Sequence, residues 1–291
     1  MAITDPHAAE FESHRDLLMG VAYRMLGSVS DAEDMVQEAW LRWRDTGSVE
    51  SPRAWLVRTV SRLCLDRLKS ARVQREHYYG TWLPEPLVDS LAEPPSGVVD
   101  ESVSIALMLV LEKLTPTERA GFLLHDVFGY SFDEIAGILE KSEPACRKLV
   151  SRARERVRAE KPRFAATQAE HEDLLHRFMT ACRGGEMEPL MHLFSEGVAL
   201  YSDGGGKATA VPKILSDPDV IARFFIRIVQ DLEARYYELR PTHFNGAPGV
   251  LFLVGGTLVT ALSLDIREGK IHAIYGHRNP DKLREFLRRE R

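Results

Sequence analysis

The chain has few cysteines and no recognisable metal-binding motif. Its three cysteines, Cys64, Cys146 and Cys182, stand far apart among 291 residues and form no CxxC pair. This spacing provides neither a disulfide framework nor a zinc signature, so we expect no bound metal and no cofactor. A reducing cytoplasm suits such a chain.

Targeting signals and long hydrophobic runs are also lacking. The N-terminal segment MAITDPHAAEFE is too polar for a secretory signal peptide. The longest apolar stretch, Val250–Leu264, is short for a transmembrane helix and is interrupted by Gly255 and Gly256. No internal repeat is evident. We therefore expect a cytoplasmic protein with no membrane partner.

The charge is distributed unevenly along the chain. The formal net charge of -5 argues against a uniformly basic nucleic-acid binder. However, the basic segments Arg53–Arg75 and Arg147–Arg163 flank an acidic segment, Glu85–Glu143. Two separate basic segments predict two contacts with a polyanion.

Three parts can be distinguished along the sequence. Apolar residues spaced by three and four predict helices throughout residues 8–75 and again over about 101–160. Between them, residues 77–100 are rich in proline, glycine and acidic residues, as in a linker. The apolar Trp82 and Leu83 in this linker indicate that it docks on another surface.

The C-terminal third has a mixed pattern. Helices are predicted at 169–183, 186–194 and 217–231, and strands at 197–202, 235–243, 249–255, 257–265 and 270–277. Helices followed by a meander of strands predict an α+β domain with a curved sheet.

An acidic amphipathic helix is predicted at Asp31–Arg42, DAEDMVQEAWLR. Ser30 is the expected N-cap, with Glu33 as its capping-box partner, and the acidic first turn suits the helix dipole. In isolation this segment fits an ordinary surface helix. Its position before a basic helix and a helix-turn-helix also allows a docking role.

A helix-turn-helix is predicted at Phe132–Val157, with the turn at Lys141-Ser142 and Pro144 in the first turn of the second helix. That helix is amphipathic. Its exposed face carries Arg147, Lys148, Ser151, Arg152, Arg154, Arg156 and Arg158. Such a face suits a helix that reads bases near its start and contacts phosphates along its flank. The alternative is a basic helical hairpin that binds no DNA.

A second basic helix is predicted at Trp55–Val73 and is less diagnostic. Its exposed residues are Arg58, Arg62, Lys69 and Arg72. A solvated basic surface would explain them equally well.

Together these segments resemble a bacterial extracytoplasmic-function sigma factor, a specificity subunit of RNA polymerase. Tyr23–Trp43 resembles the sigma-2 helix pair that binds the clamp helices of the largest polymerase subunit. Trp55–Arg72 resembles the helix and loop that melt and read the −10 element. Thr115–Val157 resembles the sigma-4 domain, which reads the −35 element and meets the β flap. Three motifs in this order make the resemblance specific.

The C-terminal third extends the resemblance, because ordinary members end after sigma-4. It is similar to the SnoaL-like fold, a cone-shaped α+β barrel related to nuclear transport factor 2. Three short motifs resemble those of the sigma subgroup that carries this fused domain: WLPEP, DGGGK and NPDKL. In that subgroup the tail is thought to regulate the sigma core in cis.

The resemblance implies roles for particular residues. Those at the polymerase interface are Asp31, Glu33, Asp34, Gln37, Glu38 and Leu41. Those at the −10 element are Arg58, Arg62, Lys69 and Arg72. Those at the −35 element are Arg147, Lys148, Ser151 and Arg152 for bases, with Arg154, Arg156 and Arg158 for phosphates. The regulatory set is Trp82, Leu83, Pro84, Asp203, Gly204, Gly205, Gly206, Lys207, Asn279, Pro280, Asp281, Lys282 and Leu283.

Two residues depart from the family pattern. Glu140 stands in the turn where members often have glycine, which predicts some strain there. Cys146 replaces the more usual valine of the recognition helix.

The expected architecture is therefore multidomain. It comprises an all-α sigma-2 bundle at 8–76, a linker at 77–102, an all-α sigma-4 domain at 103–162 and a SnoaL-like α+β domain at 168–291. The expected partners are core RNA polymerase, promoter DNA and a small molecule in the SnoaL-like pocket. We expect a monomer when the protein is free.

Two other classes of function remain open. One is a helix-turn-helix regulator that acts without polymerase and has a ligand-sensing tail. The other is an enzyme, with pocket residues Tyr201, Asp203, His243, Tyr275 and His277; however, no spacing assigns them catalytic roles. We expect no catalysis.

Overall fold

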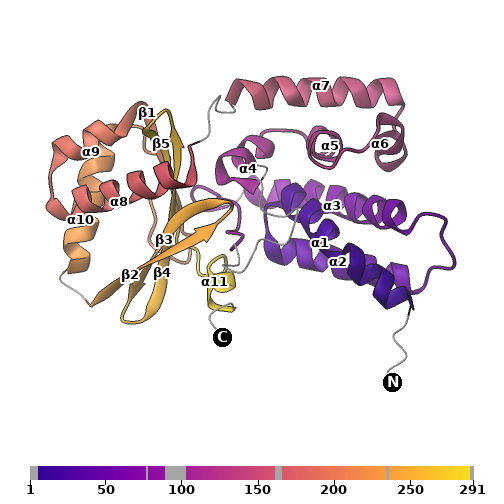
Figure 1. The fold of residues 1–291 in the computed structure, drawn as a ribbon, viewed down its shortest axis with the longest axis horizontal. Helices are drawn as coiled ribbons and strands as arrows, with labels where there is room; N and C mark the ends of the chain where they lie inside the picture. Colours follow the sequence, from indigo (N-terminus) through magenta and orange to yellow (C-terminus); the bar gives the residue numbers. More distant parts are fainter. Residues whose placement is uncertain (1–5, 77, 89–102, 161–165, 234–235, 289–291) are drawn as a thin grey trace. The chain divides into compact units, whose positions relative to one another are not determined.

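The computed structural model describes residues 6–76, 78–88, 103–160, 166–233 and 236–288 (Figure 1). These residues form two compact units. The first comprises the described residues within 6–76, 103 and 107–160, and the second those within 78–88, 104–106, 166–233 and 236–288. Each unit is described separately below. Among the described residues, no helix is long and apolar enough to cross a membrane.

The first unit begins with three packed helices, α1 (Pro6–Leu26), α2 (Val29–Arg44) and α3 (Pro52–Glu76). In α2, one face is buried at helical spacing by Ala32, Val36, Ala39 and Trp43. The indole of Trp43 donates a hydrogen bond of 2.9 Å to the carbonyl of His7. This apolar face holds α2 against its neighbours and leaves the opposite face to solvent.

The start of α2 differs from the sequence-based expectation. Ser28, and not Ser30, is the N-cap: its backbone is extended and its hydroxyl accepts a hydrogen bond of 3.1 Å from the Asp31 amide. The prediction of a cap at Ser30 was therefore wrong. Gly27, with φ of +68°, ends α1 so tightly that the next helix begins two residues earlier than expected.

The second part of this unit contains α4 (Ile105–Glu112) from Leu107 onward, α5 (Pro116–Phe122), a π-helical turn η2 (Leu123–Val127), α6 (Phe132–Leu139) and α7 (Glu143–Glu160). Capping boxes start α5, at Thr115 and Glu118, and α6, at Ser131 and Glu134. The helix-turn-helix of α6 and α7 confirms the motif read from the sequence. Glu140 takes the left-handed conformation, with φ of 54°, so the predicted strain in this turn is confirmed.

Two buried arginines connect the two parts of the first unit. Arg24 on α1 and Arg119 on α5 are 1% and 2% exposed. The Nε atom of Arg119 donates a hydrogen bond of 3.0 Å to the carbonyl of Arg24, and its guanidinium forms an ion pair with Glu112. The Arg24 guanidinium lies 5.4 Å from the centre of the Phe128 ring. Buried charges of this kind persist only where partners satisfy them.

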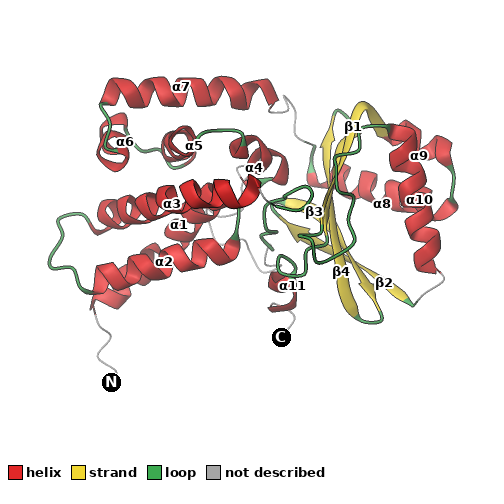
Figure 2. Cartoon of the chain, turned by 180° about the vertical axis from the view of Figure 1, so that it is seen from behind, coloured by secondary structure: helices red, strands yellow, loops and turns green. Residues whose placement is uncertain are grey.

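The second unit is an α+β domain, as expected from the sequence (Figures 1 and 2). Its strands are β1 (Phe194–Asp203), β2 (Tyr237–Phe244), β3 (Ala247–Val254), β4 (Thr257–Arg267) and β5 (Lys270–His277). They form one sheet in the order β1-β5-β4-β3-β2. The β1–β5 pair is parallel and the others are antiparallel. The helices are α8 (Gln168–Gly184), α9 (Met187–Leu193), α10 (Pro218–Glu233) and α11 (Arg284–Arg288).

The two faces of the sheet are covered by different parts of the chain. Val250 and Phe252 of β3 belong to a core shared with α8, α9 and α10. The alternate residues Leu251 and Leu253 point to the opposite face, where Leu283, Phe286 and, at the margin, Val88 of the linker pack. The sheet therefore has one face that docks helices and one that receives the linker and the C-terminal segment.

Candidate functional site

The basic face of α7 is partly paired within the first unit. The guanidinium of Arg147 donates from Nε to Glu143 at 3.2 Å and lies 4.4 Å from the centre of the Phe132 ring. The Nε atom of Arg154 donates to Asp126 at 2.8 Å. Both arginines are thus held in defined orientations along the helix.

Glu118 orients two further arginines. Its carboxylate lies 3.5 Å from Arg152 and 3.0 Å from Arg156, although it is itself almost buried. Burial alone would raise the pKa of Glu118. Hydrogen bonds from Thr115 and the charges of Arg156 and Arg152 more than compensate, so the pKa is lowered and the carboxylate stays ionised.

The remaining polar residues of α7 face solvent. Lys148, Ser151 and Arg158 are exposed, and within the described ranges their side chains form no hydrogen bond or ion pair. The buried residues of the same helix, Cys146 and Val150 among them, set this orientation. The helix therefore presents a continuous polar face that can contact a polyanion.

The second basic helix, α3, is only partly available. Arg58 is exposed, and Lys69 is exposed and paired with Asp66 at 2.8 Å. Arg62 instead contacts the end of α6: it donates to the carbonyls of Gly137 at 3.2 Å and Ile138 at 3.3 Å and to Glu140 at 2.6 Å. The side chain of Arg72 lies outside the described residues. One of the expected DNA contacts is therefore engaged with the helix-turn-helix.

The acidic helix α2 divides into structural and exposed residues. Asp31 accepts from Arg67 of α3 at 2.6 Å, which ties the two helices together. Glu38 pairs with Arg42 at 2.9 Å on the surface. The candidates that face solvent are Glu33, Asp34, Gln37 and Leu41, with the apolar side chain of Leu41 40% exposed.

In the second unit, the three short motifs come together around a buried carboxylate. Asp203 is fully buried and accepts a hydrogen bond of 3.0 Å from the amide of Gly205 in its own loop. It accepts three more from residues far away in sequence: 2.6 Å from the hydroxyl of Tyr78, 2.9 Å from the amide of Leu83 and 2.7 Å from the ammonium of Lys282. Asn279 donates to the same Tyr78 hydroxyl at 2.9 Å. We call this set, Tyr78, Leu83, Asp203, Asn279 and Lys282, the Asp203 clasp.

Lys282 also binds the linker beyond the carboxylate. Its ammonium lies 4.4 Å from the centre of the Trp82 ring and 5.2 Å from that of Tyr78, and it donates to the carbonyl of Leu83. An ammonium near two aromatic rings gains cation–π stabilisation in addition to its ion pair. Leu83 and Pro84 are buried in this arrangement, as the apolar WLPEP sequence indicated.

The DGGGK loop requires glycine because neighbouring atoms lie too close to its backbone to leave room for a side chain. Gly205 has φ of +59°, and a Cβ atom there would lie 2.2 Å from Nδ2 of Asn279. A Cβ atom on Gly204 would lie 2.3 Å from the carbonyl oxygen of Ala208. The loop ends at Lys207, which forms an ion pair with Asp281. The motif is thus a tight turn that brings DGGGK against NPDKL.

Residues outside these motifs also hold the linker. Asn245 is buried; its side-chain oxygen accepts from the Leu87 amide at 2.9 Å, and its own amide donates to the Leu87 carbonyl at 2.8 Å. The sequence Asn245-Gly246 indicates only a hairpin turn.

His277 is fully buried and donates from Nε2 to the carbonyl of Pro84 at 3.0 Å. The two remaining residues of NPDKL do not contact the Asp203 clasp in the same way as Asn279 and Lys282. Leu283 is buried in the apolar cluster with Phe286, whereas Pro280 is exposed.

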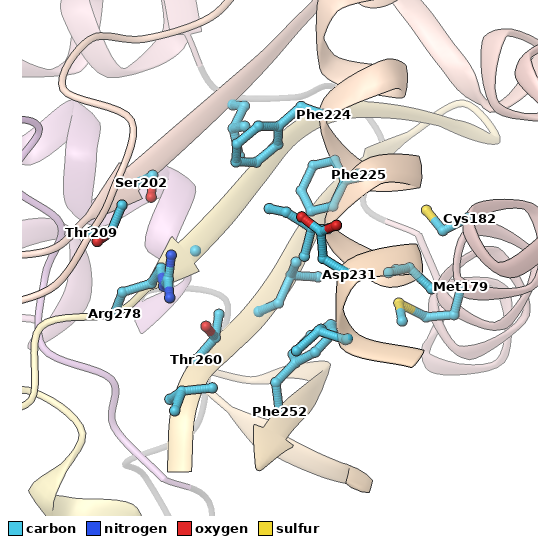
Figure 3. A pocket seen from close by; sticks show the side chains of 17 residues that line it. Met179, Cys182, Ser202, Thr209, Phe224, Phe225, Asp231, Phe252, Thr260 and Arg278 are labelled. Carbon is cyan, nitrogen blue, oxygen red and sulfur yellow. The ribbon is translucent and has the colours of Figure 1, made fainter. Parts of the chain in front are cut away.

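A cavity of about 390 Å³ lies between the sheet and helices α8 and α10 (Figure 3). Its walls are mainly apolar, and its polar lining includes Ser202, Thr209, Thr260, Asp231 and Arg278. The lining differs from the expected set of Tyr201, Asp203, His243, Tyr275 and His277, so that prediction was wrong. Asp203 and His277 bind the linker instead, because their side chains point away from the cavity side of the β1–β5 pair.

Comparisons with known proteins agree with this architecture. Residues 11–73 match the family described as Sigma-70 region 2, and residues 104–157 match Sigma-70, region 4. The ECF RNA polymerase sigma factor SigJ of Mycobacterium tuberculosis H37Rv is 39% identical over 94% of this chain and 92% of its own length. The probable ECF RNA polymerase sigma factor SigI of M. tuberculosis CDC 1551 is 32% identical over 97% of each.

A solved structure is similar to nearly the whole chain. The crystal structure of M. tuberculosis SigJ is similar to this chain with a TM-score of 0.78 and 37% identity. The match covers 95% of this chain and 98% of that one. The similarity therefore includes the C-terminal α+β domain as well as the helical regions.

The buried His277 predicts a measurable pH dependence of stability. Burial, reinforced by the nearby charge of Lys282, lowers the pKa of His277 from 6.5 to about 4. Below pH 6.5 the unfolded chain binds a proton that the folded chain does not, so stability should fall as the pH drops from about 6.5 to about 4. The contribution is at most about 3 kcal/mol.

We expect the thermal midpoint of His277→Gln to depend less on pH between about 6.5 and about 4 than that of the unmodified chain. The exposed His176→Gln is the matched control and should keep the original slope. Equal slopes for His277→Gln and the unmodified chain would contradict the assignment.

Proposed function

The chain belongs to the family of extracytoplasmic-function RNA polymerase sigma factors and directs promoter-specific transcription initiation, and we propose that its C-terminal domain regulates this activity through the Asp203 clasp. The observation that carries the proposal is the fully buried Asp203, whose four hydrogen-bond donors include two from the linker. Like other sigma factors, the protein would act on the polymerase in the cytoplasm.

For polymerase docking, we propose the exposed face of α2 as the contact with the clamp helices, and the region-4 half of the first unit as the contact with the β flap. Leu41 is the apolar centre of the α2 face, with Glu33, Asp34 and Gln37 around it. Charge complementarity would guide the encounter, and the apolar side chain would supply affinity. Asp31 would contribute indirectly, because its ion pair with Arg67 fixes the start of the helix.

Leu41→Arg should weaken binding of the protein to core RNA polymerase by at least about tenfold, or about 1.4 kcal/mol, because a charge replaces the apolar contact. A pull-down with purified core enzyme measures this directly. Ile214→Arg is the matched control, since Ile214 is 48% exposed on the second unit. Normal binding by Leu41→Arg would exclude this face of α2 as the docking surface.

For promoter DNA, we propose that Arg147, Lys148, Ser151 and Arg152 meet base edges of the −35 element. Phosphate contacts would come from Arg154, Arg156 and Arg158, and at the −10 element from Arg58, Lys69 and Arg72. No internal contact has to break before DNA can be reached by the exposed side chains of Lys148, Ser151 and Arg158. Arg62 would have to leave the carbonyls of Gly137 and Ile138 before it could contact DNA.

Base and phosphate contacts should respond differently to substitution. Lys148→Ala should relax the preference for one −35 base pair by about 1–3 kcal/mol. Arg158→Ala should weaken binding to all promoters alike. It should also reduce the slope of log affinity against log salt concentration by about 1. Transcription with core polymerase from a set of −35 variants, at several salt concentrations, separates the two. Arg177→Ala on the second unit is the control, and uniform loss in Lys148→Ala would contradict its base-reading role.

For regulation, the clasp limits the reach of the linker. Residues 78–88 are held on the C-terminal domain, whereas the same segment released could extend by roughly 35 Å. A promoter presents its −10 and −35 elements to both helical regions at once, so the available linker length matters. We therefore assign the clasped linker to a less active state of the protein.

Asp203→Asn should raise promoter-specific transcription several-fold, because it removes the charge that holds Lys282 and weakens the hold on Tyr78 and Leu83. Limited proteolysis should show faster cleavage in residues 78–88 of the same variant. Asp173→Asn, at an exposed surface pair with Arg177, is the control. Unchanged transcription in Asp203→Asn, Lys207→Ala and a C-terminal truncation would refute regulation through the clasp.

A further inference from the structure

We propose that the cavity of the second unit binds an amphipathic monocarboxylate, whose carboxylate pairs with Arg278 and whose apolar part fills the space between α10 and the sheet. We further propose that this ligand stabilises the Asp203 clasp. The second step rests on the proposed regulatory function, whereas the binding step does not.

The walls of the cavity suit an apolar body. Phe224, Phe225 and Val229 line it from α10, and Phe252 and Leu262 line it from the sheet (Figure 3). Its volume of about 390 Å³ lies at the lower end of the range for small-molecule sites. A polar or highly charged metabolite would lose hydration against these walls without compensation.

Arg278 is the cation of this cavity that lacks a partner. Its guanidinium points into the space from the end of β5 (Figure 3). The Nε atom is buried without a hydrogen-bond partner, and no acidic side chain of the described residues forms an ion pair with Arg278. Burial also lowers the pKa of Arg278, because it removes water from the charged guanidinium. An unpaired guanidinium in an apolar cavity is costly, and a carboxylate would satisfy it through two parallel hydrogen bonds.

The other polar groups restrict the ligand to one negative charge. Ser202, Thr209 and Thr260 supply hydroxyl groups to the lining but no second cation. The remaining charge, Asp231, lies on α10 with its side chain 72% exposed and 4.0 Å from Arg227. Its negative charge would repel a dianion, and Arg278 would repel a cationic amphiphile. A monocarboxylate satisfies both conditions.

The cavity and the clasp share the same strand ends. On β1, Ser202 lines the cavity and Asp203, the next residue, binds the linker. At the end of β5, Gly276 lines the cavity and His277 binds Pro84 of the linker. Arg278, the residue after the strand, again lines the cavity. The Arg278 amide donates to the carbonyl of Asp203 at 2.7 Å. A ligand bound to Arg278 therefore stabilises the backbone from which the clasp is built.

Binding is tested on the unmodified full-length chain, with octanoate as the probe. We expect octanoate to raise the thermal midpoint in a concentration-dependent manner, and octanol, octylammonium and acetate to leave it unchanged at equal concentration. Equal shifts with octanol would show an apolar site without an anion requirement and would overturn the assignment. No shift with octanoate would overturn it as well. Neither result depends on the folding of a variant.

Substitution of the arginine identifies the site. Arg278→Gln and Arg278→Met should both lose the octanoate shift, whereas Arg223→Gln, an exposed arginine on α10, should keep it. The ligand-free Arg278→Met should melt at or above the midpoint of the unmodified chain, because it removes an unpaired charge from the apolar cavity. A persistent octanoate shift in Arg278→Met would place the anion elsewhere and refute the proposal.

The regulatory step has a separate readout. Octanoate should slow hydrogen exchange of the Leu83 and Leu87 amides and lower transcription by the unmodified chain, but not by Asp203→Asn. If octanoate binds and leaves both readouts unchanged, the coupling is refuted and the binding site stands. If octanoate does not bind while Asp203→Asn still raises transcription, the ligand proposal fails and the proposed function stands.

Discussion

The rest of the second unit depends on the buried carboxylate of Asp203. A fully buried negative charge requires donors. Here they are the amide of Gly205 in the same loop, the linker hydroxyl of Tyr78, the linker amide of Leu83 and the ammonium of Lys282. Without the linker, the charge would lose two of these hydrogen bonds at a cost of several kcal/mol. The linker is therefore part of the fold of this domain, although it lies between the two helical regions in sequence.

The same principle governs the first unit, where charged residues with internal partners divide the basic surface. Arg119 pairs with Glu112 and donates to the Arg24 carbonyl, while one of its Nη atoms is buried without a hydrogen-bond partner; it joins the two helical parts. Arg62 is held by the end of α6, where helix carbonyls concentrate negative potential. On α7, Arg152 and Arg156 are exposed and paired with Glu118, whereas Lys148 and Arg158 are exposed and have no such partner among the described residues. The basic side chains of this unit thus differ in how far internal acceptors already engage them.

Much of this organisation could be read from local patterns. Helical periodicity and capping signals located the helix-turn-helix of α6 and α7, and alternation located the strands of the C-terminal domain. Local patterns failed where a neighbouring segment changed the outcome. The tight turn at Gly27 moved the cap of α2 from Ser30 to Ser28. The side-chain direction along β5 turned His277 to the linker and left Arg278 in the cavity, which residue type alone could not distinguish.

The sequence by itself determined the family, the order of its regions and the three motifs of the tail, because these depend on residue types at short, regular spacing. Only the tertiary structure decided that WLPEP, DGGGK and NPDKL converge on one carboxylate, that Asp31 and Arg62 are engaged within the chain, and that an unpaired arginine lies in an apolar cavity. These features arise from contacts between residues far apart in sequence. Their energies depend on burial and on the distance between partners, and neither quantity is visible in local patterns.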